Sequence, residues 1–406
     1  MTLAPQAVTG EGDAARRLTT PAGDPLVERG RVLALAGNCY SCHTADVRKP
    51  FAGGVAFHTD FGTIYSTNIS THRRSGIGAW TEAEFERAMR SGIGRDGQHL
   101  YPAFPYTSFT KLTDRDVKAL FAFMRTLEPV ASEPLRNSLK FPLNIRGSLS
   151  GWKLFFFDEG RFRPTPGLTG EQVRGEYLTE ALAHCGACHT PRNRLGAERR
   201  ELAYAGGRIY HRVASGDVRA WGAPNLTADP AGLRNWTARE LHHYLKSGYS
   251  TKAVLMGPMN DVVLNSTRHL PEPELRAMVA YLKALPARSV DPGPRPDAAQ
   301  MRRGELLYVA NCGSCHTLNG AGDPKTAPSL QRSAQVQAPD PSSLLNIILY
   351  GPDVSPALLL PISRPDMPAF AAKLDDKAIA DLTTFLRNSF GNRAGVVTPE
   401  QVGRQR

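Results

Sequence analysis

Hydrophobic residues recur along this chain with the spacing of amphipathic helices, and the same arrangement occurs three times. The clearest cases are three segments in which apolar side chains fall at positions i, i+3, i+4 and i+7. Their residues are Val117, Leu120, Phe121 and Met124; Leu275, Met278, Val279 and Leu282; and Ile379, Leu382 and Leu386, with Thr383 as the weak member. Each segment is predicted to be the closing helix of a repeated unit.

A middle helix is predicted ahead of each closing helix. Capping boxes begin this helix at Thr81 and Thr237, and Gly92 and Gly248 fit the caps at its C-terminal end. The third counterpart covers residues 342–351. The repeated units therefore share both the type and the order of their helices.

An Arg-Gly pair lies in the first helix of every unit, with its glycine at Gly30, Gly175 or Gly304. The first of these helices follows Asp24 and Pro25, which fit an N-cap and the first helical position. A glycine inside a helix costs about 1 kcal/mol relative to alanine. Its recurrence at one place in three units indicates that another helix crosses closely there.

These helices predict an all-α protein of three tandem domains. The domains are assigned to residues 23–130, 166–286 and 301–393. The remaining segments are an N-terminal tail, a linker, a proline-rich linker and a C-terminal tail, at residues 1–22, 131–165, 287–300 and 394–406. The apolar residues 152–157 in the first linker are expected to pack between domains, with a partner or membrane surface as the alternative.

Composition excludes some classes of protein. The 406 residues are 41% hydrophobic and 21% charged, which excludes wholesale disorder. No run of about 18 apolar residues occurs, which argues against a transmembrane helix, and residues 1–11 lack the regions of a secretory signal. The formal net charge is +11, but lysine and arginine are spread along the chain, so charge is weak evidence for nucleic-acid binding.

All six cysteines fall in one pentapeptide pattern that occurs three times. The three sets are Cys39, Cys42 and His43; Cys185, Cys188 and His189; and Cys312, Cys315 and His316. C-x-x-C-H is the attachment motif of c-type haem. Its two thiols form thioethers with the haem vinyl groups, and the adjacent histidine supplies the proximal imidazole to iron. The chain is therefore predicted to carry three covalently bound haems c.

Two other uses of the cysteines explain the pattern less well. Disulfides would leave the repeated histidine unexplained, and cysteines two residues apart pair with each other mainly in redox motifs. Zinc needs four converging ligands, so three separated Cys2His sets would need extra ligands. Covalent haem accounts for both the cysteines and the histidine.

The sixth iron ligand is expected on the loop before each closing helix and is usually methionine or histidine. Met367 lies in a proline-rich loop of the third unit and is the predicted ligand of the third haem. Met259 is the predicted ligand of the second haem, with Met256 as its rival three residues earlier. A core methionine that fills a gap is the competing interpretation.

The first unit departs from this pattern because Phe104 occupies the place of the methionine and cannot ligate iron. Met89 aligns with the middle helix and fits a core position better. His99 lies on the same loop as Phe104 and is the predicted sixth ligand of the first haem. His58, His72 and an open five-coordinate iron remain as alternatives.

With these units laid out, the sequence resembles the trihaem cytochrome c subunits of bacterial periplasmic dehydrogenase complexes. The resemblance covers residues 25–392, and its local markers are FAGG at 51–54, GTIYSTNI at 62–69, CHTPRN at 188–193 and APNLT at 223–227. It implies three class I cytochrome c-like domains, each around one haem. Such subunits accompany flavin or quinoprotein alcohol and sugar dehydrogenases, and also molybdenum hydroxylases that oxidise nicotinate or aldehydes.

The departure at Phe104 favours the branch that accompanies molybdenum hydroxylases, because alcohol-type subunits usually carry methionine there. The resemblance implies an electron-transfer subunit that accepts electrons from a catalytic subunit, of the molybdenum/iron–sulfur or the flavin/PQQ type. It passes them to quinone or a terminal oxidase. No substrate-converting site and no nucleic-acid partner are expected. A peroxidase-like enzyme with an open first haem is the alternative.

The compartment follows from the chemistry of attachment. In the bacteria that this sequence resembles, covalent haem c is attached on the periplasmic side of the inner membrane. A periplasmic location is therefore expected, in association with the periplasmic face of that membrane.

Overall fold

The computed structural model describes residues 23–213, 215–323, 326–355, 357–358 and 367–406. The chain forms two compact units. The first contains the chain up to His184 together with Arg212–Val218 and Asp261–Tyr281. The second contains Cys185–His211, Arg219–Asn260 and Leu282–Arg406. The predicted second domain is thus divided between the units, and the assignment of three domains stays a prediction.

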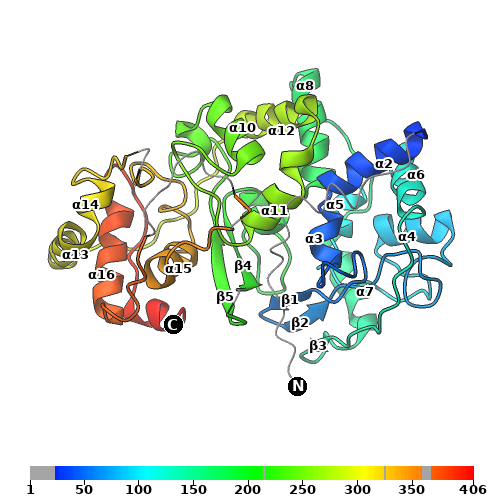
Figure 1. Ribbon diagram of the computed structural model, residues 1–406, viewed down its shortest axis with the longest axis horizontal. Coiled ribbons are helices and arrows are strands. Elements are labelled where there is room, and N and C mark those ends of the chain that lie inside the picture. The colour runs from blue at the N-terminus through cyan, green and yellow to red at the C-terminus, as the bar shows by residue number, and fades with distance from the viewer. Residues whose placement is uncertain (1–22, 214, 324–325, 356, 359–366) are drawn as a thin grey trace. The chain divides into compact units, whose positions relative to one another are not determined.

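The first unit consists mainly of helices (Figure 1). They are α2 (Pro25–Ala36), α3 (Cys39–His43), α4 (Glu82–Ser91), α5 (Tyr106–Phe109), α6 (Asp114–Met124), α7 (Leu149–Phe156), α8 (Gly170–Glu176), the π-helix η2 (Tyr177–Leu182), and the 3-10 turns η1 (Arg146–Ser148) and η5 (Thr267–His269). A small antiparallel sheet joins β1 (Ala56–Thr59), β2 (Gly62–Tyr65) and β3 (Ser138–Leu139) in that order, with Ala56 opposite Tyr65 and Gly62 opposite Leu139.

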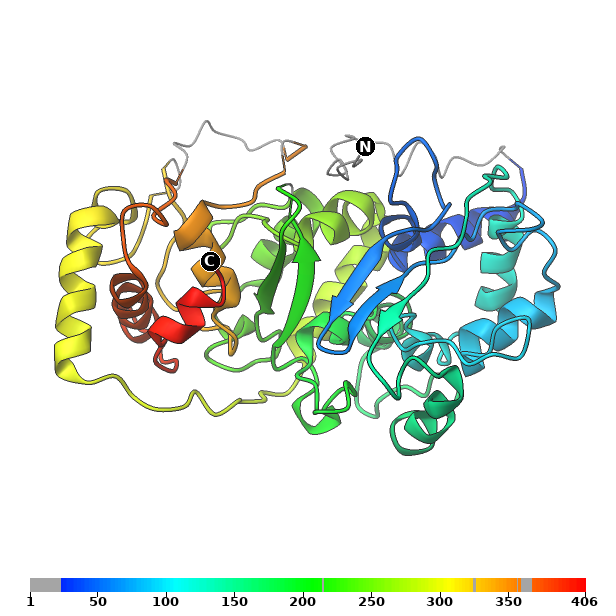
Figure 2. The ribbon, with the colours of Figure 1, turned by 90° about the horizontal axis from the view of Figure 1, so that it is seen from below.

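The second unit also combines helices with a small sheet. Its helices are α9 (Gly186–His189), α10 (Ala238–Ser247), α13 (Ala298–Asn311), α14 (Gly313–His316), α15 (Ser342–Tyr350), α16 (Asp376–Asn388) and α17 (Pro399–Gly403), with 3-10 turns η3 (Arg200–Leu202) and η4 (Leu233–Asn235). The strands β4 (Gly207–Arg212) and β5 (Val218–Ala223) pair with each other (Figure 2). Two helices run from one unit into the other, α11 (Met259–Asn265) and α12 (Glu272–Ala284).

The predicted close helix crossings are confirmed at all three glycines. A Cβ atom on Gly30 would overlap the backbone oxygen of Ala119 in α6. Gly175 meets the backbone of Ala277 in α12 in the same way, and Gly304 meets that of Asp381 in α16. Only glycine lets the first and the closing helix of each repeat approach so closely.

The arginine before each of these glycines forms an ion pair with the closing helix. Arg29 Nε lies 2.5 Å from Asp116 Oδ1, Arg174 Nη2 lies 2.6 Å from Glu274 Oε1, and Arg303 Nε lies 2.6 Å from Asp381 Oδ2. The Arg-Gly pair therefore combines a close backbone approach with a charged contact. The middle helices α4 and α10 also begin with the predicted capping boxes at Thr81 and Thr237.

Each unit has its own hydrophobic core. The core of the first unit joins side chains of α2 and α6 to those of η2 and α12, including Leu33, Phe123, Leu178 and Met278. The second core is built around α13, α15 and α16 and includes Tyr308, Leu345 and Leu382. The first unit therefore buries residues from two of the predicted domains in one core.

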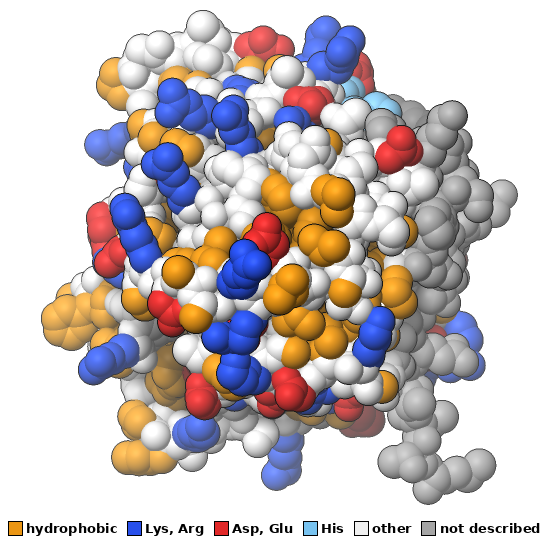
Figure 3. Space-filling model, turned by 90° about the vertical axis from the view of Figure 1, so that its left-hand side faces the viewer, with side chains coloured by type: hydrophobic (Ala, Val, Ile, Leu, Met, Phe, Trp, Pro, Cys, Tyr) orange, Lys and Arg blue, Asp and Glu red, His pale blue; other side chains and the backbone are white. Residues whose placement is uncertain are grey.

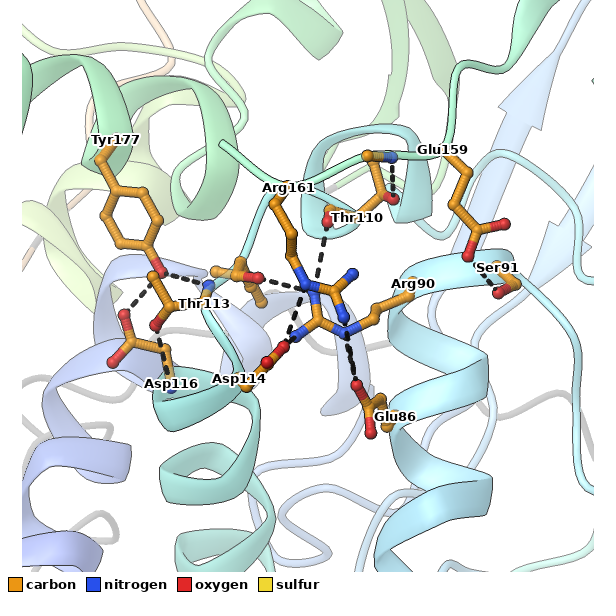
Figure 4. Close-up of polar contacts among 12 residues, drawn as sticks. Glu86, Arg90, Ser91, Thr110, Thr113, Asp114, Asp116, Glu159, Arg161 and Tyr177 are labelled. Atoms are coloured by element: carbon orange, nitrogen blue, oxygen red, sulfur yellow. Dashed lines mark hydrogen bonds and ion pairs between the residues drawn. The ribbon is translucent and has the colours of Figure 1, made fainter. Parts of the chain in front are cut away.

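The segment that follows α7 is held on the first unit by polar contacts (Figure 4). Arg161 lies 3.0 Å from Asp114, and the buried Arg90 donates to the same carboxylate at 2.5 Å. Glu159 accepts a hydrogen bond of 2.7 Å from Ser91. These bonds fix the end of the first linker against α4 and the start of α6.

The apolar residues 152–157 have mixed surroundings. Phe157 packs on Tyr106, with 5.1 Å between ring centroids. Leu154 and Phe155 are instead exposed, at 80% and 77%. Leu154 and Phe155 therefore do not meet the expectation that residues 152–157 pack between domains. No helix among the described residues is long and apolar enough to span a bilayer.

Candidate haem-binding sites

The three C-x-x-C-H pentapeptides all fold as short helical turns, in α3, α9 and α14. None of the six cysteines forms a disulfide, so all six are available for thioether bonds to haem vinyl groups. Burial raises the pKa of Cys39 to about 12 and that of Cys312 to about 11, so both are protonated at neutral pH. Zinc would need converging ligands, and the described residues contain no group of three or more His, Cys, Asp or Glu side chains suited to a metal ion.

The histidine of each motif makes the same hydrogen bond. Nδ1 of His43 lies 2.7 Å from the carbonyl oxygen of Thr67, and Nδ1 of His189 lies 2.8 Å from that of Pro224. The third motif repeats it, with 3.1 Å from Nδ1 of His316 to the carbonyl oxygen of Pro328. Because Nδ1 donates to a carbonyl, Nε2 carries the lone pair that can bind iron.

The electrostatic surroundings also favour the neutral imidazole. Burial lowers the pKa of His43, His189 and His316 below the usual value, and the hydrogen bonds to the carbonyl oxygens oppose this shift only in part. A neutral ring with a fixed Nδ1 proton is the form that ligates metal. All three sites therefore fit an axial histidine of haem iron.

Asparagine side chains hold the carbonyl groups of the first two sites in place. Asn68 follows Thr67, donates to the carbonyl of Val130 at 2.7 Å and accepts from the amide of Ser70. Asn225 follows Pro224, donates to the carbonyl of Arg288 at 2.7 Å and accepts from the amide of Thr227. Both asparagines lie in local markers of the family resemblance, but sequence reasoning gave them no role.

The two predicted methionine ligands lie at the ends of defined elements. Met259 is the first residue of α11 and, like its rival Met256, is half-buried. Met367 is half-buried beside the second core, and the loop after it is bonded to α15 through the amides of Phe370 and Ala371. Residues 359–366 of that loop lie outside the described residues. Ligation by Met259 and Met367 stays a prediction.

The first site contains no methionine at the corresponding loop position. Phe104 packs against Phe109, with 5.4 Å between ring centroids, and Met89 is buried in the core as expected. Nδ1 of His99 is buried and has no hydrogen-bond partner among the described residues. Burial, together with the nearby Lys153 ammonium, lowers the pKa of His99. A neutral His99 is suited to binding iron, and its role as sixth ligand stays a prediction.

The alternative histidines make local contacts in the first unit. Nδ1 of His58 lies 3.0 Å from Thr63 Oγ1, across the pair of strands β1 and β2. Nδ1 of His72 lies 2.8 Å from Ser75 Oγ and 3.1 Å from the amide nitrogen of Ser75. Both rings are therefore engaged within their own hairpin or turn through Nδ1.

The third motif lies on an exposed side of the second unit. Cys315 is exposed, and so are the nearby apolar side chains Leu306 (61%), Val309 (55%) and Leu318 (70%). Figure 3 shows the side that carries α13 and α14, where hydrophobic side chains alternate with lysine and arginine. Lys373 is exposed and close enough to oppose the rise in the pKa of Cys312. We call Leu306, Val309 and Leu318 the third-motif patch.

Comparison with known proteins shows which family this chain resembles. The cytochrome c family model matches residues 27–128 and 301–390, which include the first and third motifs. The cytochrome c subunit of alcohol dehydrogenase (quinone) from Gluconacetobacter polyoxogenes is 37% identical, over 96% of this chain and 86% of that protein. The gluconate 2-dehydrogenase cytochrome c subunit from Pantoea cypripedii is 36% identical, over 94% of this chain and 89% of that protein.

A longer relative comes from another type of complex. A nicotinate dehydrogenase subunit from Pseudomonas putida is 40% identical over 90% of this chain, and this chain spans 30% of that protein. Relatives of both types thus match this chain over at least 90% of its length. The chain belongs to the cytochrome c family, as an electron-transfer subunit of dehydrogenase complexes.

Proposed function

We propose that this chain carries three haems c and conducts electrons from the catalytic subunit of a dehydrogenase to quinone or a terminal oxidase. The observation that carries the proposal is the hydrogen bond from Nδ1 to a backbone carbonyl, which recurs at His43, His189 and His316. When bound, haem c supplies reversible one-electron chemistry. The chain holds each imidazole in one tautomer and one orientation, which keeps the ligand field constant through many turnovers.

The proposed ligand sets differ between the sites. His99 is the proposed sixth ligand of the first haem, Met259 of the second and Met367 of the third. Imidazole is a stronger donor than thioether, and methionine ligation raises the potential of haem iron. The first haem is therefore proposed to have the lowest potential of the three.

The favoured catalytic partner is a molybdenum hydroxylase that oxidises an aldehyde or an N-heterocycle. Two observations support this choice: Phe104 stands where alcohol-type subunits usually carry methionine, and a nicotinate dehydrogenase subunit is 40% identical. A flavin- or PQQ-dependent alcohol or sugar dehydrogenase is the second candidate, because relatives with those names cover nearly the whole chain. A peroxidase-like activity of the first haem would require an open iron there.

The proposed location is the periplasm, at the periplasmic face of the inner membrane. The exposed Leu154 and Phe155, beside the half-buried Trp152, are the kind of side chains that bind at a membrane interface or a permanent subunit contact. The same chemistry suits either surface. The membrane or a partner subunit is proposed to cover Trp152, Leu154 and Phe155 of α7.

The test is production of the full chain with a c-type haem maturation system and its own dehydrogenase. Mass spectrometry of the denatured protein should show three added haems, and Cys185→Ala/Cys188→Ala should remove one. Reduction of the haems should then follow addition of nicotinate-like or aldehyde substrates rather than alcohols. Two haems in the wild type, or reduction by alcohols alone, would overturn the corresponding part of the proposal. Carbon monoxide binding to the reduced first haem would favour the peroxidase-like alternative.

A further inference from the structure

Ser41, inside the first haem motif, is bonded to a helix that lies more than 200 residues later in the chain. Its hydroxyl accepts a hydrogen bond of 2.9 Å from Asn265 Nδ2 and lies 3.3 Å from the carbonyl oxygen of Asp261. The Ser41 hydroxyl donates its proton to Asn38 Oδ1 at 2.8 Å, which is closer than the Asp261 carbonyl. Asp261 and Asn265 are four residues apart in α11, so Ser41 contacts this helix at two points one turn apart.

The far end of the same helix carries the proposed ligand of a different haem. The helix α11 begins at Met259, two residues before Asp261. Its other end is fastened in the first unit, where His269 Nε2 lies 2.8 Å from the carbonyl oxygen of Leu264, and Val263 is fully buried. A short helix held at its last turn and at Ser41 has little freedom to move its first residue.

A second contact within the first unit involves the residue that directly precedes the second motif. His184 directly precedes Cys185, and its ring packs against Phe109, with 5.8 Å between centroids. The ring lies close to the backbone of Gly37, which is two residues before Cys39. Within the first unit, His184 and α11 are thus both held against residues beside the first motif.

We propose that Ser41 is a positioning residue for the second haem, although it lies within the attachment motif of the first. Ser41 and Asn265 hold α11 so that the thioether of Met259 stays on the second iron. This inference rests on the proposed ligation by Met259. A shift of α11 would weaken that bond and expose the second iron to other ligands, while the first haem keeps its cysteines and His43.

The third motif offers a matched control. Ser314 occupies the same place in its pentapeptide as Ser41, but it is exposed and its hydroxyl lies 3.9 Å from Sγ of the neighbouring Cys315. Replacement of Ser314 by alanine therefore removes the same chemical group from the same motif position without touching α11. The second motif already has alanine, Ala187, at this position.

The experiment compares full-length holoproteins carrying Ser41→Ala, Ser41→Thr, Asn265→Ala, Ser314→Ala and Met259→Ala. Each is measured for haem number, for the near-infrared methionine–iron band of the oxidised form, and for binding of imidazole. One hydrogen bond contributes about 0.5–1.5 kcal/mol net. Ser41→Ala and Asn265→Ala should therefore keep three haems but bind imidazole about two- to tenfold more tightly at one haem. Ser41→Thr should restore the wild-type affinity, and Ser314→Ala should not change it.

The possible failures are distinguishable. If Met259→Ala removes part of the methionine–iron band while Ser41→Ala and Asn265→Ala both bind imidazole like the wild type, the positioning role is wrong and the ligand assignment stands. If Met259→Ala leaves the band unchanged, the proposed ligand itself is wrong. An equal effect of Ser314→Ala would also overturn the inference, because the effect would then belong to the motif serine in general.

Discussion

The first and third haem motifs have the same pentapeptide pattern but opposite surroundings. In the first, Tyr40 is buried, and Ser41 is bonded to α11. In the third, Gly313 and Ser314 stand in the places of these residues, Cys315 is exposed, and the third-motif patch lies nearby. An electron can leave a protein only where a redox partner can approach the cofactor. If each motif carries its proposed haem, this difference predicts that the haem at the third motif exchanges electrons with a partner and that the haem at the first motif is an internal relay or an endpoint.

The largest expected effect concerns the sixth ligands. His99→Ala should convert the first haem from low spin to high spin and leave the other two unchanged, because no other side chain would complete its coordination. Met367→Ala should remove the methionine–iron band of the third haem alone. Electron paramagnetic resonance and near-infrared spectra of both variants measure this. An unchanged spectrum for His99→Ala would move the assignment to Met89 or His72.

Substitutions at the helix crossings should have a nearly equal effect on stability, and they test the two units one at a time. Gly30→Leu places a side chain against the backbone of Ala119 and should lower the free energy of unfolding by about 3 kcal/mol, through overpacking in the first unit. Gly304→Leu should do the same in the second unit.

The matched control for these variants lies within α7. Gly151→Ala meets no other atom within 4 Å and should be neutral or stabilising by up to about 1 kcal/mol. Calorimetry and site-specific hydrogen exchange distinguish the units. A single transition that shifts equally for Gly30→Leu and Gly304→Leu would show that the units unfold together.

Electron exchange with a partner should depend on the third-motif patch. Leu318→Glu places a negative charge on this surface and should slow reduction or reoxidation by the physiological partner, about tenfold, without loss of haem. Lys373→Glu should weaken any dependence of that rate on salt. Salt acts on the rate by screening exposed charges such as Lys373, over a distance of about 10 Å at 0.1 M ionic strength. Stopped-flow kinetics at several salt concentrations measures both. Wild-type rates for Leu318→Glu would place the exchange site elsewhere.

The smallest expected effect is on the pH dependence of stability, through the ion pair of Asp46 and Arg48 beside the first motif. The Arg48 guanidinium lowers the pKa of the half-buried Asp46 carboxyl to about 2, mainly by hydrogen bonding to it. The folded state therefore binds this proton less readily than the unfolded state. The pair stabilises the fold above about pH 4, and that contribution disappears as the pH falls towards 2. Nuclear magnetic resonance titration of Asp46 should show the low midpoint, and Arg48→Gln should return it to the usual range.

Local sequence patterns predicted the helices and their caps correctly. Gly30, Gly175 and Gly304 indicated close crossings, and Thr81 and Thr237 indicated capping boxes, because each depends on neighbouring residues alone. None of the strands β1 to β5 was predicted, since strands this short give little periodicity. The histidine–carbonyl bonds were also missed. Their partners lie 24, 35 and 12 residues after the histidines, and a backbone acceptor leaves no residue type to recognise.

The division of the chain into two units could not be derived from the repeats. Tyr177 donates to the buried carboxylate of Asp116 at 2.5 Å, and Lys111 lies 2.5 Å from Glu180. Both contacts join residues of different predicted domains within the first unit. The repeat predicts which helices a domain contains, but such pairings depend on side chains from distant parts of the sequence.

The first unit contains both the start of the chain and residues as late as Tyr281, which has a consequence for biogenesis. In the proposed periplasmic location, a chain exported from its N-terminus could not complete this unit until about two-thirds of its length had crossed the membrane. We expect haem attachment at Cys39 and Cys42 to take place on an incompletely folded chain, with the third site maturing independently. Limited proteolysis of chains ending at residue 260 or 286 tests this: the longer should protect Leu178, and equal protection of both would refute the expected order.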